Sequence, residues 1–348
     1  MNFCVHIDNG AEIHGYFVPD GFSTVPVINV RLNNAADVIQ IPTWIHIEGA
    51  RAQGAHQTGN VGFVLYDANV PGISSAEHVE LSDPETGLVF YRRAKPGQYL
   101  EKKVLRVETS YMPQAEIDVA LRQYFQFFET KVERFGFETI RQMLEIIHQP
   151  SVFVSGRILL RNFRTYINYN IDTTMISLRD PFYELAMRLI IFSRLQTQPF
   201  RFVPPRDITL FKPVIEHFNG LVFQDEDTVK AAIRNASKDA MNLLASPFTQ
   251  QLVAASPSDS VTLDDVSQAL DMLSQFSLFD SGYDQTSYAT GIADLLDIPV
   301  HTIASKPLLE PVHHLSDVLR KISRVEHILE ADMVLYHFIR EAERKANN

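Results

Sequence analysis

The chain has 348 residues, of which 45% are hydrophobic, and 31 Lys and Arg against 42 Asp and Glu give a net charge of −11. This charge argues against nonspecific binding to nucleic acid or to anionic membranes. The apolar content is that of a folded protein with a large core rather than a disordered chain. The length predicts two domains.

The only cysteine, Cys4, has no second cysteine with which to form an internal disulfide. The first residues show no basic segment followed by a long apolar core, as a secretory signal would. No apolar run approaches the roughly 18 residues of a membrane-spanning helix. These features predict a cytoplasmic protein without a membrane span.

Residues 1–95 predict an antiparallel β-sandwich. Short apolar runs recur about every ten residues, and turn signals such as Asn9-Gly10 and Pro71-Gly72 separate them. The expected strands are 3–7, 25–32, 38–41, 61–66, 78–81 and 88–91, within a sandwich of about six to eight strands. The histidines of this part are scattered, and no pair has the spacing of a metal site.

A change in composition at Lys95-Pro96-Gly97 predicts a linker, and residues 100–348 predict an α/β domain. Apolar runs that suit buried strands alternate with segments of helical period, which indicates a parallel sheet. The expected strands are 102–108, 151–155, 175–178 and 275–278, and the expected helices between them include 115–128, 137–147 and 158–166. Segment 197–213 predicts a loop, and 227–244, 286–296 and 315–343 predict a helical C-terminus.

Arg179-Asp180-Pro181 lies where an expected strand ends and a helix begins. Asp180 suits the N-cap of that helix and Pro181 suits its first turn. Arg179 would then stand at the sheet edge where such domains bind ligands, and a guanidinium suits phosphate or sulfate. The alternative is a purely structural role for Arg179 in a cap or salt bridge.

Three stretches within about 100–342 resemble bacterial sulfotransferase domains. The first is MISLRDPFYELAMRL (175–189). The second comprises Ser246–Leu252, the helix that follows the capping box Thr262/Asp265, and the run 275–299. The third is DMVLY (332–336). The resemblance implies a P-loop-like α/β fold that uses 3′-phosphoadenosine 5′-phosphosulfate as donor. In such domains the arginine of the Arg-Asp-Pro turn binds the donor's 3′-phosphate, a role that maps to Arg179.

The same resemblance implies a donor loop after the first strand, at Glu108–Pro113. Thr109 and Ser110 would supply hydroxyls and backbone N–H groups to the phosphosulfate, as anion-binding loops do. Sulfuryl transfer also requires a base for the acceptor hydroxyl and a positive group near the transferred sulfuryl. His148 and Glu108 are the main candidates for the base, with Glu138 as another, and Arg157 is the candidate positive group beside the donor.

Two residues depart from the family pattern. Glu108 is acidic in a loop where the family has a basic residue, and Met187 stands where the family has a serine that holds the 3′-phosphate. Two functions related to this family therefore remain open. One is transfer of a sulfuryl group to a hydroxyl of a surface polysaccharide or glycan; the other is an inactive relative that acts as a glycan-binding or assembly factor.

The N-terminal segment also resembles small β-sandwich modules found beside bacterial glycosyltransferase and sulfotransferase domains, in 51–56, GNVGF (59–63) and ELSDPETGLVFYRR (80–93). That resemblance implies an accessory module that contacts a glycan or a partner protein. A third possibility is an interaction protein with an all-β head and a helical body, in which the Arg-Asp-Pro turn is only a helix cap. No HExxH or comparable metal signature is present.

Overall fold

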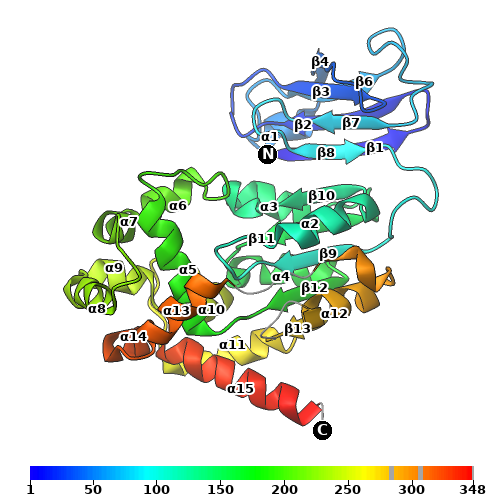
Figure 1. Cartoon of the computed structure of the whole chain (residues 1–348). Coiled ribbons are helices and arrows are strands. Elements are labelled where there is room, and N and C mark those ends of the chain that lie inside the picture. Colours follow the sequence, from blue (N-terminus) through cyan, green and yellow to red (C-terminus); the bar gives the residue numbers. More distant parts are fainter. Residues whose placement is uncertain (282–285, 305–308, 347–348) are drawn as a thin grey trace.

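The computed structural model of the chain describes residues 1–281, 286–304 and 309–346 (Figure 1). Two antiparallel sheets make up the N-terminal part, and a parallel sheet surrounded by helices makes up the rest. The predicted order of an antiparallel β part, a parallel α/β part and a helical C-terminus is confirmed.

Each N-terminal sheet has four strands, and phenylalanines fill the space between the sheets. Phe17 stacks on Phe90 with ring centroids 5.3 Å apart, and Phe3 and Phe63 also contact Phe90. One sheet contains β1 (Asn2–Asp8), β2 (Ile13–Val18), β6 (Asn60–Leu65) and β5 (Ile45–His46); the other contains β4 (Ile39–Pro42), β3 (Val27–Leu32), β7 (Val79–Ser82) and β8 (Val89–Arg92), and α1 (Glu48–Ala52) lies between β5 and β6.

The sequence did not predict β2, because Gly15 interrupts its apolar pattern. Glycine is required at this position by the close approach of the neighbouring strand. A Cβ atom on Gly15 would lie 2.4 Å from the carbonyl oxygen of Cys4. The sequence also did not predict β5, which is only two residues long.

The parallel sheet has five strands, in the order β10-β11-β9-β12-β13. The strands are β9 (Lys103–Val107), β10 (Phe127–Thr130), β11 (Val152–Gly156), β12 (Thr173–Ser177) and β13 (Leu278–Asp280). The connections that leave the neighbouring strands β9 and β12 run to opposite sides of the sheet, toward β10 and β13 respectively. This pair is therefore the topological switch point, where open α/β sheets bind ligands.

Helices cover both faces of the parallel sheet. Val104 and Met175 face α2 (Ala115–Leu121) and α12 (Thr286–Leu296), whereas Leu105 and Ile176 belong to the core on the other face. That face is covered by α3 (Phe137–Leu144), α4 (Leu160–Asn170), α10 (Pro247–Val253), α11 (Val266–Leu273) and α15 (Glu330–Ala346). A lateral group contains α5 (Pro181–Arg194), α6 (Pro205–Leu210), α7 (Lys212–Phe218), α8 (Glu226–Asn235), α9 (Lys238–Leu243), α13 (Glu310–Leu319) and α14 (Ser323–Ile328).

Several predicted boundaries were wrong for local reasons. Segment 197–213, expected as a loop, contains α6 and the start of α7, because Pro205 and Pro213 stand in first turns, which tolerate proline. The helix expected at 227–244 is divided into α8 and α9, and Ser237 caps the second by accepting from Ala240 N. Segment 315–343, expected as one long helix or a broken one, is broken into α13, α14 and α15, which agrees with the second alternative.

Residues 125–128 were expected in a helix, but 127–130 form the edge strand β10. Helix α2 ends at Leu121 and a short 3₁₀ turn follows. Phe127 is fully buried and stacks on Phe3 of β1 with centroids 6.0 Å apart. Tertiary packing against the sandwich thus overrides the helical period of this stretch.

The sandwich packs directly on the β10 edge of the parallel sheet (Figure 1). One hydrophobic cluster contains residues of both parts, including Phe90 of β8 and Phe127 of β10. Arg92 Nη1 donates to the carbonyl oxygen of Gln126 at 3.0 Å, and Gln126 Nε2 donates back to the carbonyl oxygen of Arg92 at 2.7 Å. In the parts of the chain that the structure describes, no helix has the length and apolar character to cross a membrane.

Candidate functional site

The carboxyl edge of the parallel sheet brings together most of the residues singled out from the sequence. Thr109 and Ser110 follow β9, Arg157 follows β11, and Arg179 follows β12. The loop after β9 is tied to the end of β12, since Thr109 Oγ1 donates to the carbonyl oxygen of Ser177 at 2.5 Å. Thr109, Ser110 and Arg179 therefore lie at the switch point between β9 and β12, and Arg157 follows the adjacent strand β11. The strand and turn signals predicted the position of Arg179 at a strand end.

His148 is not at this edge. It precedes β11, at the amino-terminal edge of the sheet, and its side chain is exposed. It lies near His6 of the sandwich. Burial of His6, together with the neighbouring imidazoles of His14 and His148, lowers the pKa of His6. Glu138 lies on the exposed side of α3 and pairs with Arg141 at 2.9 Å.

The loop after β9 already has carboxylate partners for its backbone N–H groups. The Glu108 carboxylate accepts from Ser110 N at 3.3 Å through one oxygen and from Gln114 N at 3.1 Å through the other. Glu184 of α5 accepts from Tyr111 N at 2.9 Å and is completely buried. Three N–H groups that would be available in an anion-binding loop thus point at carboxylates of the chain itself.

Glu184 was not identified from the sequence. Its only signal is an acidic residue four positions before Arg188 on a helix, which is the spacing of an ordinary surface pair. In the structure Arg188 Nε donates to Glu184 at 2.9 Å, and both side chains are buried. The pair therefore holds a carboxylate directly beneath the loop rather than at the surface.

A buried arginine, also not identified from the sequence, supports Glu108. Arg106 of β9 is 1% exposed and donates to Glu108 at 3.1 Å, to Gln114 Oε1 at 2.8 Å and to Asp118 at 2.7 Å. Burial by itself would lower the pKa of Arg106, but Asp118 and Glu108 outweigh it and raise that pKa. Burial raises the pKa of Glu108, against the effects of Arg106 and the Gln114 N–H.

Arg157, the predicted positive group, is neutralised within the chain. Its guanidinium pairs with Glu133 at 3.1 Å and with Asp207 at 2.9 Å, and it stacks on the Tyr111 ring at 3.9 Å. The pocket beside it also contains Arg206 and has a volume of about 80 Å³. Pockets for nucleotide-sized ligands usually measure roughly 300–1,000 Å³.

Arg179 is the predicted cationic ligand that has no described hydrogen bond or ion pair. In the described part of the chain its guanidinium makes no hydrogen bond or ion pair, and it lies 5.8 Å from the Tyr183 ring. The neighbouring Asp180 caps α5 as predicted, accepting from Phe182 N at 3.0 Å and Tyr183 N at 3.1 Å, and pairs with Arg320 at 2.6 Å. The first N–H groups of α5 are therefore also occupied by a carboxylate.

The DMVLY stretch has a structural role in the fold. Asp332 accepts from Phe248 N at 2.9 Å and from Thr249 N and Oγ1 at 2.7 Å, which joins α15 to the start of α10. Tyr336 OH donates to the carbonyl oxygen of Ser281 just after β13. Of the run 275–299, residues 282–285 lie outside the described residues. The capping box of Thr262 and Asp265 is present as predicted.

No group of three or more His, Cys, Asp and Glu side chains suited to a metal ion occurs among residues 1–281, 286–304 and 309–346. Comparison of the chain with protein-family models, with curated proteins and with solved structures finds no match.

Proposed function

We propose that this chain is a noncatalytic relative of sulfotransferase-type α/β domains that acts as a binding or assembly factor. The observation that supports this proposal is the occupation of the loop after β9 by Glu108 and Glu184, which accept from Ser110, Tyr111 and Gln114 N–H groups. A phosphosulfate would have to displace two buried carboxylates or approach them closely, and both are costly in a low-dielectric site.

The pairing of arginines with carboxylates at the same edge also supports the proposal. Arg106, Arg157 and Arg188 are each paired with carboxylates of the chain. A donor with several negative charges requires uncompensated cations. Among Arg106, Arg157, Arg179 and Arg188, Arg179 is the one without a hydrogen bond or ion pair to the described residues.

A sulfotransferase that acts on a glycan hydroxyl is the second candidate. The uncommitted guanidinium of Arg179 at the switch point favours it, as does Ser110 Oγ, which is buried without a partner among the described residues. Glu108 would have to be the base in that case, because His148 lies at the opposite edge of the sheet. Its two carboxylate oxygens, however, already accept hydrogen bonds.

Calorimetric titration with 3′-phosphoadenosine 5′-phosphate distinguishes the two candidates. The proposal expects no saturable binding up to millimolar nucleotide, by the intact chain or by Arg179→Ala. Micromolar binding that Arg179→Ala removes while Arg234→Ala, on the exposed face of α8, retains it would refute the proposal and favour the enzyme.

A further inference from the structure

A pocket lies away from the donor edge, between the sandwich and the parallel-sheet domain. It has a volume of about 520 Å³. This is within the roughly 300–1,000 Å³ typical of small-molecule sites. Its wall combines β7 and β8 of the sandwich, Tyr99 of the linker, and Arg122 and Gln123 after α2. We refer to it as the interdomain pocket.

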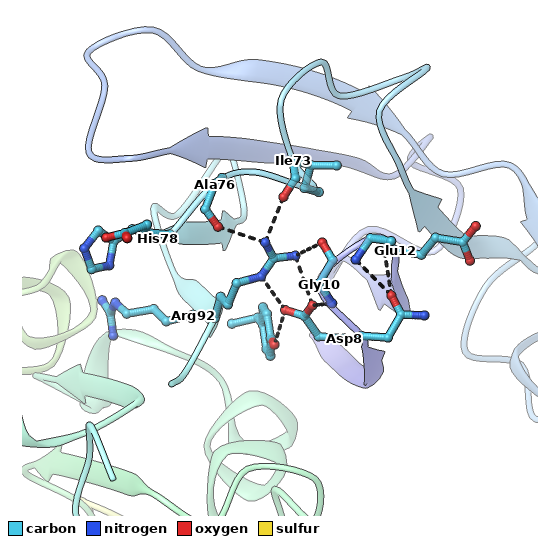
Figure 2. A network of polar contacts seen from close by, with 12 residues as sticks. Asp8, Gly10, Glu12, Ile73, Ala76, His78 and Arg92 are labelled. Atoms are coloured by element: carbon cyan, nitrogen blue, oxygen red, sulfur yellow. Dashed lines mark hydrogen bonds and ion pairs between the residues drawn. The ribbon is translucent and has the colours of Figure 1, made fainter. Parts of the chain in front are cut away.

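Arg93 at one end of the interdomain pocket is fully engaged in holding the sandwich together. It donates to both carboxylate oxygens of Asp8 at 2.9 and 3.0 Å and to the carbonyl oxygens of Gly10, Ile73 and Ala76 (Figure 2). All three of its nitrogens are used in this way, so Arg93 has little capacity left for a ligand.

Arg92 and Glu80 compensate each other within the wall. Arg92 Nε donates to Glu80 at 2.9 Å, and Arg31 approaches the other Glu80 oxygen at 3.4 Å. Arg92 Nη1 is bonded to the Gln126 carbonyl oxygen, whereas Nη2 has no bond within the described chain. The single acidic side chain of the interdomain pocket is thus already neutralised.

Two basic side chains face the same space without partners. Arg122 lines the pocket from the parallel-sheet domain and His78 lines it from the sandwich. His78 lies beside Arg92 (Figure 2). Within the described ranges neither side chain makes a hydrogen bond or an ion pair. A guanidinium and an imidazole without described partners suit a ligand with one negatively charged group. A nucleoside triphosphate or bisphosphate carries several negative charges and would require more cations.

The remaining wall suits a hydroxylated ring. Tyr99 is half-buried, and burial raises the pKa of its hydroxyl, which therefore stays protonated as a donor. The amide side chains of Asn34, Gln98 and Gln123 are exposed at the rim. Amides offer both donors and acceptors to hydroxyl groups, and an aromatic ring offers a flat apolar face.

We propose that the interdomain pocket binds an acidic saccharide, with its single carboxylate or sulfate at Arg122 and His78, its hydroxyls at the amides and one ring face on Tyr99. This inference deepens the proposed binding function and rests on it.

The test is calorimetric titration of the full chain with digalacturonic acid, with a disaccharide 6-sulfate, and with neutral cellobiose. At least one of the acidic probes should bind at least about tenfold more tightly than cellobiose, and the tighter of the two identifies the acidic group. Arg122→Gln should weaken that binding about tenfold or more, while Arg234→Gln should not change it.

Equal affinity for acidic and neutral probes, no binding of any probe, or unchanged binding by a folded Arg122→Gln variant would each overturn the inference. Titration of the same samples with 3′-phosphoadenosine 5′-phosphate separates this failure from that of the proposed function. Nucleotide binding refutes the noncatalytic assignment, whereas absence of both ligands refutes only the acidic-saccharide site.

Discussion

Asp332 links the C-terminal helix to α10 through three short hydrogen bonds in a fully buried site. Asp332→Ala leaves Phe248 N and Thr249 N without acceptors, while the Thr249 hydroxyl is able to rotate. Each buried donor left unsatisfied costs roughly 1–3 kcal/mol, so we expect a loss of about 2–6 kcal/mol in the free energy of unfolding. Asp332→Asn keeps one oxygen but turns an amide donor toward Phe248 N, so it should lose about 1–3 kcal/mol.

The same carboxyl group predicts a pH dependence. Burial, opposed by the backbone N–H groups of Phe248 and Thr249, raises the pKa of Asp332 from 3.8 to about 6. The folded state therefore holds a proton that the unfolded state has lost between these values. The group's contribution to stability is complete below about pH 4 and falls by about 3 kcal/mol as the pH rises through 6.

Urea unfolding of wild type, Asp332→Ala and Asp332→Asn at pH 4.5, 6 and 7.5 measures both effects. Asp271→Asn removes an exposed carboxylate and is the matched control, with no expected change. The stability difference between wild type and Asp332→Asn should shrink as the pH rises. A loss below about 1 kcal/mol for Asp332→Ala, or a difference that grows with pH, would refute the reasoning.

Three further substitutions test the described contacts. Ser110→Ala should change the free energy of unfolding by less than about 0.5 kcal/mol or stabilise the chain, because the buried Ser110 hydroxyl has no described partner. A clearly lower melting temperature for the variant would contradict this. Asp180→Ala should cost about 1–2 kcal/mol in urea unfolding through the lost α5 cap and the Arg320 pair, and an unchanged midpoint would argue against the cap. Phe127→Ala should lower the free energy of unfolding by about 3–5 kcal/mol and expose residues 94–99 to protease, because the Phe127 ring stacks on Phe3. A folded variant with unchanged cleavage would show that other contacts hold the two parts together.

Much of the fold could be predicted from local pattern. The Arg179-Asp180-Pro181 turn, the capping box at Thr262 and the alternation of buried strands with helices each depend on residues close in sequence. Strand β10 could not be predicted in this way, because its conformation is decided by Phe3, more than a hundred positions away.

The sequence predicted the positions of Thr109, Ser110 and Arg179, but it misplaced His148 and did not predict the electrostatics of this edge. Strand ends fix where Thr109, Ser110 and Arg179 lie, because carboxyl ends of parallel strands meet at one edge. The sequence did not show that Glu184 reaches the loop after β9 or that Arg106 is buried. Such pairings join separate elements, and a charged side chain in a strand or helix has no local signature of its partner.

The carboxylates of Glu108 and Glu184 give the loop after β9 a ligand that is part of the polypeptide. Anion-binding loops commonly gain stability from the anion, so their folding equilibrium follows its concentration. In this chain the two carboxylates take the place of the anion, and the fold holds them beside the loop at a constant effective concentration. The proposed function therefore predicts that neither the order of this loop nor the thermal stability of the chain depends on the nucleotide concentration.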